Sequence, residues 1–311
     1  MTDMKENIST YGPVDDQAAS LRAGQPAGRI LSSAITGTRC ITIASGKGGV
    51  GKTFVSVNLG LALARTGAKV LVFDADLGLA NADIQMGVDP EYTIQDVIYG
   101  NCSIGDAIVQ VDKNLSLLAS SSGSVEMVEI GSARRQMFVE DLVRAASAYD
   151  YLLIDVAAGI GPNISSFVNA SSELLVVLAN EPTSIMDAYS LLKLAYKATP
   201  SSSIMTVMNM VVSIDEGEAL SQRLAGITKR FLGVEFPCAG IVVFDHMVGN
   251  SIRARNPIVR YAPGTGPAQC IRELAAATIR KGGMSSAVRG INPEMFERLA
   301  DMGSAGTGGN G

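Results

Sequence analysis

The stretch that most constrains this chain is Ser-Gly-Lys-Gly-Gly-Val-Gly-Lys-Thr at residues 45–53, which separates a short apolar run from a longer one. A glycine, four further residues and then Gly-Lys-Thr is the spacing of a phosphate-binding loop between a strand and a helix. Glycines leave the backbone N–H groups of such a loop open to phosphate oxygens, and the helix directs its positive end at them. The apolar runs at 40–43 and 55–64 predict that strand and that helix. The pattern therefore predicts a nucleotide-binding α/β domain.

Within this loop, two side chains are expected to act directly on the nucleotide. Lys52 is expected to reach the β- and γ-phosphates, and the hydroxyl of Thr53 is expected to ligate Mg²⁺. The rest of the predicted cradle consists of backbone groups from Gly46, Lys47, Gly48, Gly49, Val50 and Gly51.

Two further apolar runs end in carboxylates. Residues 70–76 end in Asp74 and Asp76, and residues 151–155 end in Asp155. Ligands of doubly wound sheets bind at the carboxyl ends of the strands, and alternation directs Asp74 and Asp76 to the same side. Asp155 is placed to hold Mg²⁺ through water, and the small residues at 157–161 suit a loop that senses the γ-phosphate. The alternative is that these carboxylates are polar strand ends without chemistry.

The second lysine of the loop, Lys47, narrows the class. The run from Lys47 to Thr53 resembles the deviant phosphate loop of the MinD/ParA ATPases. In that family two nucleotide-bound subunits face each other, and each offers this lysine to the phosphates of its partner. The resemblance implies ATP and Mg²⁺ as cofactors, an ATP-bound homodimer, Asp76 as the residue that activates the attacking water, and Asp74 as support for the magnesium site. A solvated surface lysine is the alternative for Lys47.

The same resemblance implies how adenine is recognised. Asn209 ends an apolar run where the family commonly uses an asparagine, whose amide both donates and accepts. The family's Pro-x-Asp segment aligns with residues 243–245, which implies a contact by Asp245, although the proline is missing. Val156 stands where many members have a threonine.

Periodicity along the chain predicts one doubly wound domain. Strand candidates begin near residues 41, 70, 115, 152, 174, 206 and 239, and helices are expected at 53–65, 134–148, 183–198, 216–232 and 267–280. Such alternation is typical of a mostly parallel sheet with helices on both faces. We expect a flexible arm at 1–38, the ATPase domain at 39–282, and a short helix with a glycine-rich tail at 283–311.

Composition and charge exclude several function classes. The net charge of −5 gives no general attraction to nucleic acid. Residues 251–290 hold seven basic side chains against Glu273 alone, so this segment is either a solvated face or a contact for an acidic partner or lipid surface. Neither a membrane-spanning run nor a signal-peptide core occurs. The four cysteines form no Cys-x-x-Cys pair, which argues against a metal centre and against the related iron–sulfur carrier ATPases. The expected location is the cytoplasm.

Two segments are similar to the FlhG/FleN group of MinD-like ATPases, which set flagellar number and placement. One is residues 77–83, Leu-Gly-Leu-Ala-Asn-Ala-Asp. The other is the arm sequence at 16–22, which matches the Asp-Gln-Ala-x-x-Leu-Arg motif that stimulates FlhF, a GTPase of the signal-recognition-particle type. The resemblance implies that partner-binding residues are Asp16, Gln17, Ala18, Leu21 and Arg22. A chance helical segment is the alternative.

Residues 291–302 form the last motif, a short amphipathic helix that Asn292 and Pro293 start. Members of the family often attach to membrane through such a helix. The acidic face of this one disfavours anionic lipid, so peripheral membrane contact and docking on its own domain remain alternatives.

The resemblance implies a slow, dimerisation-dependent ATPase that acts as a switch in flagellar number and placement. Its implied partners are an FlhF-type GTPase, flagellar switch-complex (C-ring) proteins and, in polar-flagellated bacteria, a sigma54-type flagellar activator, at the inner membrane or the cell pole. A MinD-type division-site ATPase, a ParA-type partition ATPase and a non-catalytic nucleotide-binding scaffold are the alternatives.

Overall fold

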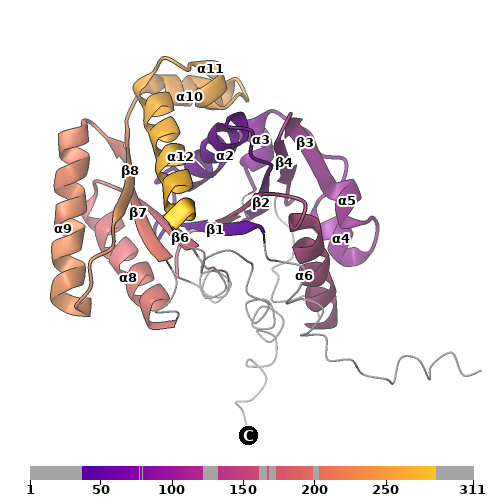
Figure 1. Cartoon of the computed structure of the whole chain (residues 1–311), viewed down its shortest axis with the longest axis horizontal. Coiled ribbons are helices and arrows are strands. Elements are labelled where there is room, and N and C mark those ends of the chain that lie inside the picture. Colours follow the sequence, from indigo (N-terminus) through magenta and orange to yellow (C-terminus); the bar gives the residue numbers. More distant parts are fainter. Residues whose placement is uncertain are drawn as a thin grey trace, which may run out of the picture.

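The computed structural model describes residues 37–76, 78, 80–121, 132–160, 167, 173–198 and 203–284. The arm motif at 16–22, the amphipathic segment at 291–302 and the residues Leu77 and Leu79 lie outside this part of the chain. Within it, strands and helices alternate, as the sequence pattern predicts (Figure 1).

The strands form one sheet in the order β3-β4-β2-β5-β1-β6-β7-β8. Their bounds are β1 Arg39–Ala44, β2 Val70–Ala75, β3 Ile108–Asp112, β4 Leu115–Leu118, β5 Tyr151–Val156, β6 Glu173–Ala179, β7 Ser203–Val211 and β8 Cys238–Val243. Neighbouring strands are parallel except β3 and β4, which are antiparallel. The predicted mostly parallel sheet is therefore confirmed. The sequence pattern did not predict β3, because this short edge strand is half-buried and has no continuous apolar run.

The described helices fall into a long and a short group. The long ones are α2 Lys52–Arg65, α6 Ser132–Ala146, α8 Pro182–Ala198, α9 Ile214–Leu232 and α12 Gly266–Met284. The short ones are α3 Ala82–Met86, α4 Ile94–Tyr99, α5 Ile104–Ala107, α10 His246–Arg253 and α11 Ile258–Tyr261. The five long helices match the five predicted ones to within a few residues. The short group was not predicted, because one or two turns give little helical periodicity.

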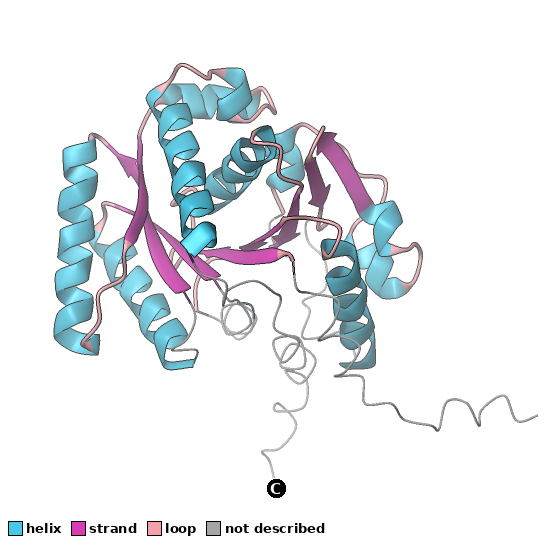
Figure 2. Cartoon of the chain, in the orientation of Figure 1, coloured by secondary structure: helices cyan, strands magenta, loops and turns pink. Residues whose placement is uncertain are grey.

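Helices cover both faces of the sheet, which lies between them in Figure 2. Along β2, Val70 and Val72 belong to the apolar cluster that includes α2 and α12, whereas Leu71 and Phe73 belong to the cluster that includes α6 and α8. Strands such as β2 and β6, in which every residue is buried, thus pack on both sides, which explains why they read as continuous apolar runs. The doubly wound α/β class is confirmed.

The two ends of the parallel strands, called here the amino edge and the carboxyl edge, differ in chemistry. At the amino edge, the guanidinium of Arg39 makes a buried ion pair with Glu173 (Nη2 to Oε2, 2.6 Å) and also donates to the backbone carbonyl of Thr278 in α12. The loops after β1, β2, β5, β7 and β8 meet at the carboxyl edge, where ligands bind in such folds. In the part of the chain that the structure describes, no helix combines the length and apolar character that crossing a membrane requires.

Candidate nucleotide-binding site

The loop between β1 and α2 takes its shape from glycines. Gly49 and Gly51 adopt left-handed backbone angles (φ 81° and 86°), and Gly51 is the N-cap of α2. A Cβ atom on Gly46 would lie 2.3 Å from the backbone carbonyl of Asp187 in α8, whereas a Cβ on Gly48 or Gly49 would meet open space. Gly46 therefore serves packing against α8, and the outer glycines leave the concave side of the loop clear for a ligand.

A buried lysine–aspartate pair lies directly behind the loop. The Nζ atom of Lys52 is 2.7 Å from Oδ1 of Asp155, and the Ser56 hydroxyl donates to the same oxygen at 2.9 Å. The other oxygen, Oδ2, is buried and has no hydrogen-bond partner among the described residues. A buried carboxylate oxygen without a donor is rare in folded proteins, and it suits an ion or a water bound to that ion. The pair therefore fits magnesium beside Thr53, the second residue of α2.

Asp74 lies next to Asp155 across the β2–β5 ladder. Its carboxylate accepts hydrogen bonds of 3.1 Å from the backbone N–H groups of Asp76, Asn81 and Ala82. Burial and then the negative charge of Asp155 raise the pKa of Asp74 to about 7, while the N–H groups of Ala82 and Asp76 oppose that rise. With both of its oxygens accepting from this segment, Asp74 fixes the path of the chain that presents Asp76.

Lys47 folds back onto its own subunit. Its amine forms an ion pair with Glu181, which immediately precedes α8, and donates to the hydroxyl oxygen of Thr183 in the first turn of α8 at 3.0 Å. Both partners are exposed. The backbone N–H of Gly159, in the loop after β5, donates to the carbonyl of Ser45 at 2.8 Å. Neither Glu181 nor Thr183 was singled out by sequence reasoning, because no local motif shows that the start of α8 lies beside the phosphate loop.

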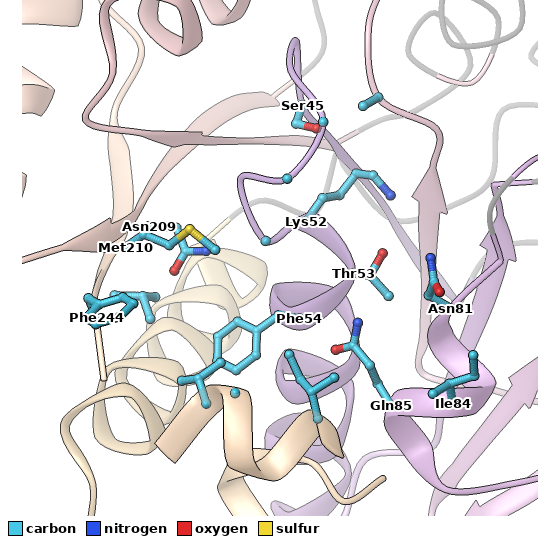
Figure 3. Close-up of a pocket in the computed structure, with 18 of the residues that line it drawn as sticks. Ser45, Lys52, Thr53, Phe54, Asn81, Ile84, Gln85, Asn209, Met210 and Phe244 are labelled. Atoms are coloured by element: carbon cyan, nitrogen blue, oxygen red, sulfur yellow. The ribbon is translucent and has the colours of Figure 1, made fainter. Parts of the chain in front are cut away.

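A cavity of about 870 Å³ opens in front of the loop (Figure 3). Of the predicted site residues, those that line it are Gly48, Gly49, Gly51, Lys52, Thr53, Asp76, Asn209 and Asp245. Five others do not line the cavity: Gly46, Lys47, Val50, Asp74 and Asp155. The structure thus gathers the first group around one space and places Asp74 and Asp155 behind it as support.

The wall away from Lys52 is largely apolar. In Figure 3, Met210 and Phe244 lie beside Asn209, and Phe54 lies between them and the end of the cavity that Gln85 and Ile84 form. Phe244 is 63% exposed, and Met210 has a left-handed backbone (φ 59°), which is costly for a residue that is not glycine. Such a wall suits the face of a nucleobase.

The two polar residues predicted at this end have structural contacts of their own. Nδ2 of Asn209 donates to the carbonyl of Val50 at 2.8 Å, so one of its donors ties β7 to the phosphate loop. Oδ1 of Asp245 accepts from the N–H of Met247 at 2.8 Å and caps α10. Sequence reasoning did not single out Met210 or Phe244 as ligand contacts, because their positions depend on the irregular pairing of β7 with β8.

The basic residues after β8 mostly contact their own chain. Arg255 pairs with Asp89 at 2.6 Å, Arg260 pairs with Asp112 at 3.2 Å, and Arg272 donates to the carbonyl of Pro263. These contacts favour the interpretation of a solvated face over that of an anion-binding patch.

Fold and site together define the class: this is a phosphate-loop nucleotide-binding α/β protein. The family described as AAA domain matches residues 38–206. The antiactivator FleN of Pseudomonas aeruginosa is 36% identical over 235 residues, which are 76% of this chain and 84% of FleN. The flagellum site-determining protein YlxH of Helicobacter pylori is 32% identical over 266 residues, or 84% and 90% of the two chains. The chain belongs to the FlhG/FleN family of MinD/ParA-type ATPases, as the sequence motifs predict.

Solved structures agree with this assignment. MinD of Pyrococcus horikoshii, whose structure holds Mg-ADP, superposes with a TM-score of 0.67 at 28% identity. The match covers 79% of this chain and 98% of that one.

Proposed function

We propose that this protein binds and hydrolyses Mg²⁺–ATP and works as a dimeric switch in the control of flagellar number and placement. The observation that carries the proposal is the Lys52–Asp155 pair behind an open glycine loop, with one oxygen of Asp155 that has no donor among the described residues. The similarity to YlxH, a flagellum site-determining protein by name, and to the antiactivator FleN supports the biological role.

The phosphates would lie on the N–H groups of Gly48, Gly49 and Gly51. Lys52 would exchange its bond with Asp155 for the β- and γ-phosphates, which frees Asp155 to act, through water, on the metal that Thr53 ligates. Held by Thr53 and, through water, by Asp155, magnesium would supply positive charge that neutralises the phosphates. Asp76, which Asp74 holds in place through the backbone, would orient and activate the attacking water.

Lys47 would act in trans. In the described subunit it is bound to Glu181 and Thr183, so it has to leave them to reach the phosphates of a partner subunit. A cation delivered from the partner stabilises charge that grows in the transition state, and this couples hydrolysis to dimerisation.

The base would lie at the apolar end of the cavity. Asn209 would contact its polar edge with the groups that Val50 does not use, Asp245 would contribute a second polar contact, and Phe244 and Met210 would cover its faces.

The partners follow from the family and from the arm. An FlhF-type GTPase would be bound by Asp16, Gln17, Ala18, Leu21 and Arg22. C-ring proteins and a sigma54-type activator would bind the ATP-bound dimer. Residues 291–302 would make peripheral contact with the inner membrane or dock on the domain.

The test uses purified full-length protein with Lys47→Ala, Asp76→Ala and Lys52→Ala. Lys52→Ala should abolish ATP binding, because it removes the phosphate contact. Asp76→Ala and Lys47→Ala should retain binding but lower turnover by about a hundredfold or more. Light scattering with a slowly hydrolysed ATP analogue should show a dimer for the unmodified protein. Wild-type turnover in both Lys47→Ala and Asp76→Ala, or a monomer with the analogue bound, would contradict the mechanism.

The flagellar role has a separate test, because a division-site or partition ATPase would share the same nucleotide chemistry. A peptide of residues 1–30 should accelerate GTP hydrolysis by the cognate FlhF-type GTPase, and Gln17→Ala should remove the effect. No acceleration would favour the MinD-type or ParA-type alternative.

A further inference from the structure

The strand β8 forms an outer edge of the sheet, and no strand in the described part of the chain pairs with its free side. Its sequence, Cys-Ala-Gly-Ile-Val-Val, holds neither a charge nor a proline. Protein edge strands are usually protected by charges, prolines, bulges or covering elements, because their free N–H and C=O groups accept further strands. Among the described residues, β8 has two weak forms of protection: its register shifts against β7, and the thiol of Cys238, which donates to the carbonyl of Gly240 at 3.3 Å.

The opposite edge strand, β3, is better protected. Gln110 donates through Nε2 to the backbone carbonyls of Asp112 and Lys113, at 3.3 Å each, and the carboxylate of Asp112 pairs with Arg260. Side chains thus already bond the backbone carbonyls and the carboxylate at the end of β3. Because β8 has one thiol contact and no ion pair among the described residues, it is the more open of the two edge strands.

A groove of about 410 Å³ follows β8 between α9 and α12, the two helices on either side of the β8 label in Figure 1. Glycines bring these helices close to the strand. A Cβ on Gly217 of α9 would lie 2.3 Å from Ile241, and a Cβ on Gly240 would lie 3.1 Å from Leu274 of α12. The helices therefore hold the two faces of β8, and the groove opens along its outer edge.

The lining of this groove has one sign of charge. Glu218 of α9 and Glu273 of α12 are exposed, and the described residues that line the groove include no lysine or arginine. Glu273 accepts from Nε2 of Gln269 at 2.9 Å, a neutral donor that leaves the negative charge in place. Ile214, Ala239 and Ile241 add apolar side chains to the lining of the groove.

We propose that this β8 groove binds an extended, lysine- or arginine-bearing segment of a partner protein as an additional strand. The strand edge would supply main-chain hydrogen bonds, and the two glutamates would select basic side chains, the usual division of labour in strand addition. The proposal is independent of the nucleotide chemistry, because the groove shares no residue with the nucleotide cavity.

The test uses the full-length protein and two capped synthetic peptides, one of alternating valine and lysine and one of alternating valine and glutamate. Fluorescence anisotropy should show that the lysine peptide binds about tenfold or more tightly than the glutamate peptide. Hydrogen exchange should slow at the amides of residues 238–243 when the lysine peptide is bound. The double variant Glu218→Lys with Glu273→Lys should reverse the preference between the peptides.

A charge-matched control is Glu91→Lys with Glu140→Lys, which changes the net charge equally around α4 and α6 and should leave the preference unchanged. Binding of neither peptide, equal binding of both, or protection at another segment overturns the proposal. Slow exchange at residues 238–243 that arises without peptide from another occupant also overturns it. Protection that grows with protein concentration would show that a second copy occupies the groove. Protection that disappears when residues 1–36 are deleted would show that the arm of the same chain occupies it.

Discussion

At the scale of single residues, Glu181 is the side chain with the clearest consequence for the proposed switch. It holds the amine of Lys47 within the subunit, where that amine cannot serve a partner. Glu181→Gln removes the charge, so we expect ATP-dependent dimerisation to strengthen by about twofold to fivefold, the range of an exposed ion pair. Sedimentation with a slowly hydrolysed ATP analogue measures this change. The matched control is Glu235→Gln, which breaks the exposed pair with Lys229 and should leave dimerisation unchanged; weaker dimerisation in Glu181→Gln would show that Glu181 assists Lys47 in trans.

At the scale of elements, the sequence predicts features that depend on local pattern better than features that depend on long-range packing. Lys52 and Asp155 could be found in the sequence because Lys52 begins α2 at a fixed spacing from the glycines and Asp155 closes the apolar run of β5, one residue before the strand ends. Glu181 could not, because its partner Lys47 is 134 residues away in the chain. The long helices and the parallel strands can be predicted because their apolar patterns are long enough to recognise. In contrast, β3 and α3 are short and depend on their neighbours for burial.

The contact of the phosphate loop with α8 gives a prediction at this same scale. A methyl group on Gly46 would overlap the backbone of Asp187 and Ala188, which cannot yield as a flexible side chain can. Gly46→Ala should therefore lower the free energy of unfolding by about 1–3 kcal/mol and weaken ATP binding. Urea unfolding and nucleotide titration measure the two effects. Gly226→Ala is the control: its site in α9 is open, so that variant should gain about 1 kcal/mol. Equal stability of the two variants would contradict the packing role of Gly46.

At the scale of the whole molecule, the carboxyl edge and the amino edge of the sheet have different roles. The carboxyl edge holds the loops of the nucleotide site, where Oδ2 of Asp155 has no donor in the described part of the chain. The amino edge holds the buried pair of Arg39 and Glu173, which ties β1, β6 and α12 together. We therefore expect that stability at the amino edge can be changed without a change in the chemistry at the carboxyl edge.

Glu173→Gln tests this division, because it leaves the guanidinium of Arg39 buried without its counter-charge. We expect the free energy of unfolding to fall by about 3–5 kcal/mol, whereas the double variant Arg39→Met with Glu173→Leu should recover most of that loss through apolar packing. Urea unfolding measures both, and ATP affinity per folded molecule should stay at its original value in each. If the double variant is as unstable as Glu173→Gln, the bond from Arg39 to the carbonyl of Thr278 is the contact that holds α12, and the carboxylate is secondary. If ATP affinity falls together with stability, the two edges are coupled through β1, the strand that joins Arg39 directly to the phosphate loop.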